Sequence, residues 1–239
     1  MTHDNYLFRK NQLMRAFDKS LARAKPWVMS WFGEAQANQF LREARQEYEV
    51  LLPRIPFIGT NALSLSFFLP TTRYLAMYRA LQKQGRTVED VGRLAYLIGT
   101  EEAKAIPNIV QRFMEHLWFS PLVEWVIKKR NIRTQQAKYP GESVLHYVKG
   151  DGGEFDYGVD YTECAVCKFL RAENAFELTP YACAIDKPVS ELLGWGLTRS
   201  RTLAEGFPKC EFRFKRGGET RVPVPQSLEA LPGSESVQP

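Results

Sequence analysis

The sequence has little of what marks a secreted or membrane protein. It contains four cysteines in 239 residues, and its first 30 residues mix charged and apolar positions, so they lack the uninterrupted apolar segment of a signal peptide. No stretch approaches the roughly 18 uncharged apolar residues that span a bilayer. We therefore expect a cytoplasmic protein with no membrane partner, whose cysteines are reduced and do not form a disulfide framework.

Several motifs of catalysis and nucleotide binding are also missing. The chain has no G-x-S-x-G nucleophile elbow, no P-loop, no Rossmann glycine pattern and no H-E-x-x-H zinc motif. Its three histidines lack metal-ligand spacing, and His146 stands alone on a predicted strand, where a surface role is more common than general-base chemistry. No function can be assigned from these motifs.

Positive charge is in excess but is not concentrated. The net charge is +5 and the pI is near 9.0, yet the basic residues alternate with many acids along helical segments. The one dense cluster, "KKRNIRTQQAK" at 128–138, is typical of a solvated helix end, with a phosphate-binding patch as the alternative. We therefore do not expect a nucleic-acid partner.

The pattern of the chain changes character near residue 139. Residues 1–138 show helical periodicity, with a first helix ending at Pro26, a second over about 34–52, and a capping box that opens a later helix at Thr87. Residues 139–222 combine alternating strand patterns with short helices. Residues 223–239 are rich in proline and serine, and they predict a disordered tail.

The second region predicts an antiparallel sheet. "SVLHYVKG" and "EFDYGVDY" alternate as strands around a "DGG" turn, and a short helix follows over about 162–173. "ELTPYAC" reads as extended, "DKPVSELLGWG" as a short capped helix, and "LTRSRTLAEG" and "KCEFRFKRGG" as the last two strands. The predicted fold class is α+β, with an N-terminal helical part packed against a β-β-α-α-β-β region.

All four cysteines lie in this second region, at Cys164, Cys167, Cys183 and Cys210. Their spacing lacks the two close pairs typical of a four-cysteine zinc site, and the antiparallel context is unlike that of a thioredoxin motif. Burial as small hydrophobic residues explains Cys167 and Cys210 well. A reactive or substrate-lining thiol is best placed at Cys164 and Cys183, because each lies near a predicted helix start, where the helix dipole favours the thiolate.

Two further groups of polar residues flank these cysteines. Asp186 precedes Lys187 and Pro188, so it is a natural N-cap, and it can also act as a base if the surroundings desolvate it. Arg199 and Arg201 alternate along a predicted strand and point the same way, which suits either a carboxylate clamp or a solvated strand face.

Four segments together resemble the L-2-amino-thiazoline-4-carboxylic acid hydrolase family. They are "LLPRIPFIGTN" at 51–61, "FDYGVDYTECAVCKFL" at 155–170, "ELTPYACAID" at 177–186 and "GLTRSRTLAEGFPKCEFRF" at 196–214. Members of that family often have Cys-Asp-Phe near the end, whereas this chain has Cys210-Glu211-Phe212. The closing pattern is also similar to small sensor domains related to vinyl reductases.

The resemblance implies hydrolysis of a C–N or C–S bond in a small cyclic amidine, thiazoline or strained heterocycle. It implies that Cys183 attacks the ring carbon or lines the pocket, that Asp186 deprotonates water or holds the amidinium, and that Cys164 is a second thiol at the site. The remaining residues expected to bind substrate are Asn61, Tyr181, Arg199, Arg201 and Thr202.

A non-catalytic module that binds a small molecule or zinc is the alternative interpretation. The enzyme interpretation needs no cofactor and no metal, and its partner is a small-molecule substrate. A homo-oligomer stays open, because the aromatic-rich segment 113–125 can bury in a second copy as well as in the core.

Overall fold

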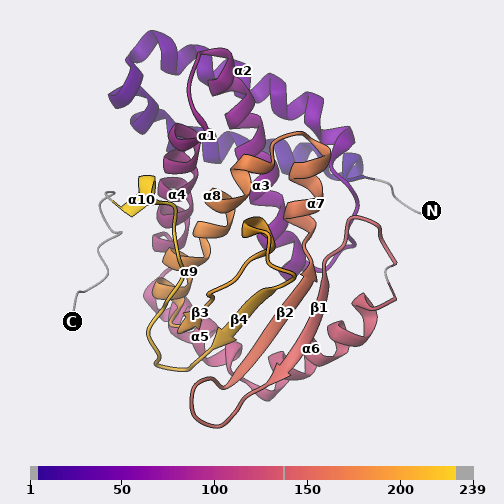
Figure 1. The fold of residues 1–239 in the computed structure, drawn as a ribbon. Helices are drawn as coiled ribbons and strands as arrows, with labels where there is room; N and C mark the ends of the chain where they lie inside the picture. Colours follow the sequence, from indigo (N-terminus) through magenta and orange to yellow (C-terminus); the bar gives the residue numbers. More distant parts are fainter. Residues whose placement is uncertain (1–4, 137, 230–239) are drawn as a thin grey trace.

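The computed structural model describes residues 5–136 and 138–229. Helices form its first part, and a four-stranded sheet with short helices forms its second, which confirms the predicted α+β class. Figure 1 shows the sheet beside α8 and α9, with α1 and α2 at the end of the molecule far from the strands. Within the described residues, no helix is long and apolar enough to cross a bilayer.

The helical part buries one large apolar core between its first four helices. Its elements are the 3-10 turns η1 (Leu7–Arg9) and η2 (Leu52–Arg54) and the helices α1 (Lys10–Phe32), α2 (Glu34–Leu51), α3 (Ala62–Lys83) and α4 (Val88–Lys104). Apolar residues at helical spacing, such as Phe17 and Leu21, point into this core. The predicted capping box is confirmed, because Thr87 and Asp90 each bond the other's backbone N–H.

The prediction that the first helix ends at Pro26 is wrong. Helix α1 runs through Pro26 to Phe32, although proline lacks the N–H that would continue the hydrogen-bond ladder. The turns on both sides of Pro26 place Ala24 and Val28 in the core with no exposed surface, and this packing holds the helix together. The helix ends instead at Gly33, whose φ of 84° suits glycine.

Two further helices connect the helical part to the sheet. Helix α5 (Asn108–Trp118) and α6 (Pro121–Thr134) are separated at Ser120, whose hydroxyl accepts from the backbone N–H of Val123 and so caps α6. Both helices also expose large apolar side chains, among them Phe113 and Trp125. The homo-oligomer stays a prediction.

The sheet has the strand order β1-β2-β4-β3, and all neighbours are antiparallel. Its strands are β1 (Val144–Lys149), β2 (Tyr157–Glu163), β3 (Leu197–Thr198) and β4 (Cys210–Phe214). Alternation along β2 places Val159 in the second apolar core, while Asp160 pairs with Lys209 and Arg213. The inner face of the sheet thereby packs against α5, α6 and α9.

Short helices connect β2 to β3, and one of them differs from the prediction. They are α7 (Ala165–Ala172), η3 (Phe176–Leu178), α8 (Thr179–Ala184) and α9 (Asp186–Leu193), followed by η4 (Leu203–Glu205) before β4. The segment "ELTPYAC" is helical, not extended, since Pro180 lies in the first turn of α8, where a missing N–H breaks no helical bond. Asp186 is the first residue of α9, and Ile185 occupies the N-cap position in its place.

The segment after residue 222, predicted as a tail, includes one described helix. Helix α10 (Gln226–Glu229) packs against α4, and its Leu228 is fully buried. Residues 230–239 lie outside the described residues.

Candidate active site

A partly open cavity of about 160 Å³ lies between the start of α3, the short helices α7–α9 and the inner face of the sheet. Most of its wall is apolar, and Trp118 and Trp195 stack in that wall with their ring centres 4.1 Å apart. Its polar lining comes from both halves of the chain: Ser64, Arg130, Glu142, Ser143, Tyr161, Cys164, Cys183, Asp186, Arg199 and Cys210. The fold therefore brings three thiols, two carboxylates and two guanidinium groups to one largely apolar space.

Cys164 occupies the N-cap of α7, directly after β2. The nearby Cys167 thiol and the backbone N–H groups of Cys167 and Val166 stabilise its thiolate, and together they lower the pKa of Cys164 to about 7 against the opposing effect of burial. An N-cap side chain faces the unpaired N–H groups of the first helical turn, so the negative form is stabilised there. Cys164 therefore has the most thiolate character of the cavity cysteines.

Cys183 lies in a different electrostatic environment from the one expected. The sequence pattern predicts that Cys183 lies just ahead of a helix start. In the structure, Cys183 belongs to the last turn of α8, where the helix dipole does not favour an anion. Burial raises its pKa, and the nearby charge of Arg199 opposes this only partly. Cys183 is therefore a neutral thiol at neutral pH.

Asp186 forms a buried ion pair with Arg199. The Arg199 side chain is 2% exposed, and its Nη1 donates to the Asp186 carboxylate while its Nη2 donates to the carbonyl oxygen of Cys183 at 3.1 Å. Burial raises the pKa of Asp186, and the charge and hydrogen bond of Arg199 partly oppose that rise. A quarter of the Asp186 side chain stays exposed, and this residue lines the cavity. It is a carboxylate that can accept a proton.

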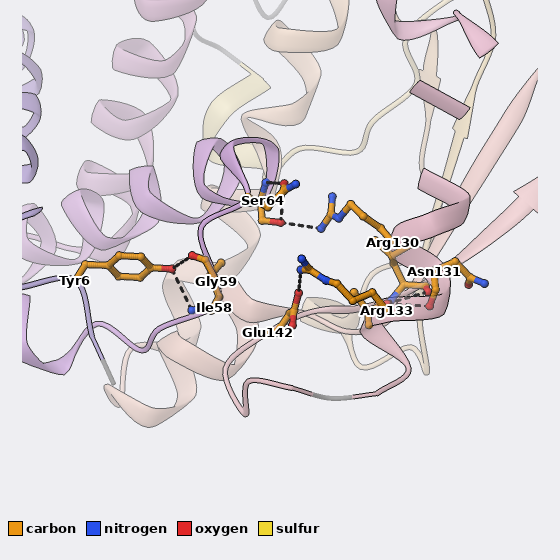
Figure 2. Close-up of polar contacts among 11 residues, drawn as sticks. Tyr6, Ile58, Gly59, Ser64, Arg130, Asn131, Arg133 and Glu142 are labelled. Atoms are coloured by element: carbon orange, nitrogen blue, oxygen red, sulfur yellow. Dashed lines mark hydrogen bonds and ion pairs between the residues drawn. The ribbon is translucent and has the colours of Figure 1, made fainter. Parts of the chain in front are cut away.

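A second cluster of charge lies where α6 meets the start of α3. Figure 2 shows Arg130 and Arg133 extending from α6, one to Ser64 and the other to Glu142. Arg130 Nη2 donates to Ser64 Oγ at 2.7 Å, whereas Arg130 Nε and Glu142 Oε2 are buried and have no hydrogen-bond partner among the described residues. Both side chains line the cavity, so unused hydrogen-bonding capacity faces it.

Four predicted site residues lie outside this cavity lining. Asn61 caps α3 by accepting from the Ser64 backbone N–H, and the Tyr181 ring covers Gly92 of α4, where a Cβ would lie 2.0 Å from it. Arg201 is exposed and lies over the ring of Phe207. Thr202, which caps η4, lines another space instead.

That other space is a second cavity of about 210 Å³, and Cys183 and Arg199 line both cavities. Pro223, Val224 and Pro225 also line the second cavity. Within the described ranges, no group of three or more His, Cys, Asp or Glu side chains could hold a metal ion.

Sequence reasoning missed Arg130, Ser64 and Glu142 as cavity residues. Arg130 belongs to the basic cluster 128–138, which was interpreted as a solvated helix end, and this is correct for the exposed Lys128 and Lys129. Arg130 differs from them because the helix turns its side chain inward, where it is 9% exposed. Its partner Ser64 is 66 positions away, so no local pattern could have joined the two.

Comparison with known protein families identifies the family of this chain. A family model described as L-2-amino-thiazoline-4-carboxylic acid hydrolase matches residues 69–214, a range that includes the sheet, α7–α9 and all four cysteines. No curated protein and no solved structure matches the chain. The chain belongs to the L-2-amino-thiazoline-4-carboxylic acid hydrolase family, which confirms the resemblance seen in its sequence.

Proposed function

We propose that this member of the family is a hydrolase that opens the ring of a small cyclic amidine, with 2-aminothiazoline-4-carboxylate as the first candidate substrate. The family description names this compound and its hydrolysis. One structural observation carries the proposal: the Cys164 thiol, with a pKa of about 7, and the Asp186 carboxylate line the same mostly apolar cavity. A nucleophile and a proton acceptor are what attack on an amidine carbon requires.

The size of the cavity supports a single small ring. Its volume is about 160 Å³, and an apolar cavity of about 150 Å³ holds a benzene-sized molecule. The stacked Trp118 and Trp195 give a flat apolar surface for one face of a ring. Such walls keep bulk water from competing for the charged groups.

The Cys164 thiolate starts the reaction by attacking C2, the ring carbon bonded to two nitrogens and a sulfur. The C2–S bond to Cys164 forms and the ring C–N bond breaks, while a proton moves from the exocyclic nitrogen to the ring nitrogen, which leaves as an amine. Water then adds to the same carbon, one of its protons passes to Asp186 and on to the amine, the other goes to the nitrogen still bonded to that carbon, and the Cys164 thiolate leaves. The product is the S-alkyl thiocarbamate of the opened chain. One water is consumed, and the enzyme returns to its starting state.

Asp186 has two tasks in this scheme. Its negative charge pairs with the amidinium before attack, and its carboxylate removes a proton from water in the second step. Its raised pKa makes it a stronger base than an exposed aspartate. Arg199 holds it in place, and the neutral thiol of Cys183 lines the cavity beside it.

Mass spectrometry of small cyclic amidines, lactams and thiazolines incubated with the protein tests this function. We expect 2-aminothiazoline-4-carboxylate to gain the mass of one water, and Cys164→Ala to lower turnover at least about 10³-fold. Cys183→Ala is the matched thiol control and keeps turnover within about tenfold.

Two results would count against the proposal. If Cys164→Ala turns over at close to the wild-type rate, the thiol takes no part in the chemistry. If the wild-type protein binds these compounds and opens none of them, the site is a binding module and the hydrolase is rejected.

A further inference from the structure

The cavity contains one cation that lacks a carboxylate partner within the described part of the chain. Arg130 is 9% exposed and lines the cavity, but its hydrogen bond goes to the neutral Ser64 hydroxyl, and its Nε has no partner there. Glu142 also lines the cavity, yet its charge is balanced by Arg133. Buried guanidinium groups are normally paired, because desolvating an unpaired charge is costly. This arrangement suits a bound anion.

The contacts of Arg130 hold its guanidinium group at the N-terminus of α3. Asn61 Oδ1 accepts from the Ser64 backbone N–H at 3.0 Å and from the Ser64 hydroxyl at 3.2 Å, which leaves the Ser64 oxygen free to accept from Arg130. Figure 2 shows the Arg130 side chain directed toward this helix start. The N-terminus of a helix also favours negative charge, so two independent features select an anion at the same place.

The other arginines considered for this role are less suitable. Arg199 already gives Nη1 to Asp186 and Nη2 to the Cys183 carbonyl, so its charge is balanced inside the protein. Arg201 is exposed and does not line the cavity.

We propose that Arg130, positioned by Ser64 and Asn61, binds the carboxylate of the substrate, so that the site selects small amidines that carry a carboxylate. This assignment rests on the function proposed above and deepens it. Arg130 anchors the negative end of the substrate while Asp186 holds the positive amidinium end near Cys164. Asn61, expected from the sequence to touch substrate, becomes a positioning residue that acts through Ser64.

Comparing two ligands that differ only in the carboxylate tests the anchor. We would measure kcat and KM for 2-aminothiazoline-4-carboxylate and for 2-aminothiazoline, with wild type, Arg130→Gln and Arg130→Lys. Arg130→Gln should lower kcat/KM for the carboxylate at least about 10²-fold, mainly through KM, and change the value for 2-aminothiazoline less than about threefold. Arg130→Lys keeps the positive charge but lacks the planar guanidinium group that binds a carboxylate through two N–H groups. It should therefore recover part of the lost kcat/KM.

Two more variants separate binding from folding. Lys129→Gln removes the same charge from the exposed neighbouring position of α6 and should leave both substrates unaffected. Ser64→Ala keeps the buried charge but removes its hydrogen-bond partner, and it should lower kcat/KM for the carboxylate about tenfold with little effect on 2-aminothiazoline. Should Arg130→Gln fail to fold, as judged by circular dichroism, the Ser64→Ala variant still gives the ratio of kcat/KM between the two compounds.

Calorimetry distinguishes failure of the anchor from failure of the proposed function. If the wild type opens neither ring but binds the carboxylate more tightly than 2-aminothiazoline, and Ser64→Ala or Arg130→Gln removes that preference, the hydrolase is rejected and the anchor stands. If turnover occurs and the ratio between the two compounds is the same in wild type and all variants, the anchor is overturned while the function stands. Absence of a wild-type preference in both turnover and binding also overturns the anchor.

Discussion

The junction between α3 and α7 and the cavity beside the sheet both contain a carboxylate paired with arginine. The two carboxylates differ in how many arginines balance their charge. At the junction, the Glu173 carboxylate accepts hydrogen bonds from Arg54 Nη2 at 2.5 Å and from Arg79 Nη2 at 2.7 Å. Arg79 also donates to the Glu173 carbonyl oxygen. In the cavity, Asp186 has one arginine, and the Nε of that Arg199 has no partner among the described residues.

The difference shows that burial of charge does not by itself identify a functional site. Glu173 lies outside the cavity lining, and its ion pairs join the helical part to the second part of the chain. Of the ten buried side-chain polar atoms that lack a partner in the described residues, five belong to cavity residues: Trp118, Arg130, Glu142, Trp195 and Arg199. Unused hydrogen-bonding capacity around a cavity, not buried charge, points to a ligand.

Of the substitutions in these two regions, Asp186→Asn should reduce catalysis the most. We expect kcat to fall about 10²–10⁴-fold, because the variant has no carboxylate to accept the proton. Wild-type turnover should fall as pH drops through the raised pKa of Asp186, since the protonated form is inactive as a base, and that contribution should be missing from the variant. The pH profile of kcat, taken where circular dichroism shows a folded variant, checks this. An unchanged profile removes Asp186 from the base role.

Replacing Glu173 by Gln should damage stability and spare catalysis. Two arginines would lose their buried counter-charge, and breaking a buried ion pair costs about 3–5 kcal/mol of unfolding free energy. Urea unfolding measures the loss, and kcat/KM below the transition should stay within about twofold of wild type. Loss of turnover in the folded variant would show that the junction also controls the site.

Thiol alkylation should separate Cys164 from the other cysteines of the cavity. Only the thiolate reacts, so the iodoacetamide rate at Cys164 should rise through pH 7 and level off above pH 8, as its pKa of about 7 requires. A thiol of ordinary pKa is about 3% thiolate at pH 7, roughly fifteenfold less than a thiol of pKa about 7, and burial places Cys183 lower still. Peptide mapping after short exposure at each pH gives both rates. Faster labelling of Cys183 would reverse their assigned roles.

Tyr181→Phe should have the smallest effect. The Tyr181 hydroxyl lies 3.3 Å from Ser227 Oγ, and losing such a bond costs about 1 kcal/mol of stability. We expect KM to stay unchanged, because the side chain packs on Gly92 and does not line the main cavity. Thermal unfolding and a KM measurement check both statements. A raised KM would restore the substrate contact expected from the sequence.

Local patterns were enough to predict much of the fold. Helical spacing predicted α2 within one residue, the Thr87 capping box predicted the start of α4, and alternation around a glycine turn predicted the hairpin of β1 and β2. Two segments that contain proline were predicted wrongly. Pro26 and Pro180 both lie within helices, and whether a helix tolerates proline depends on packing and on position within the turn.

The site was less predictable than the fold. Family motifs indicated Cys164, Cys183, Asp186 and Arg199, and the structure brings these four residues to one cavity. The direction of the Cys183 pKa shift could not be predicted, since it depends on helix α8, and the pattern of that segment predicted extended backbone. Arg130 could not be predicted either, because only the folded chain turns it inward and joins it to Ser64.

Cys183 and Arg199 line both cavities, and this has a consequence for the range of molecules that the site accepts. Because Cys183 has a small side chain, one substitution there can change the space that is open to a ligand. Gly at position 183 would remove a side chain that faces both cavities, and we expect such a variant to accept rings that bear a longer tail better than the wild type does. Selectivity for size would then be set in part by this one side chain.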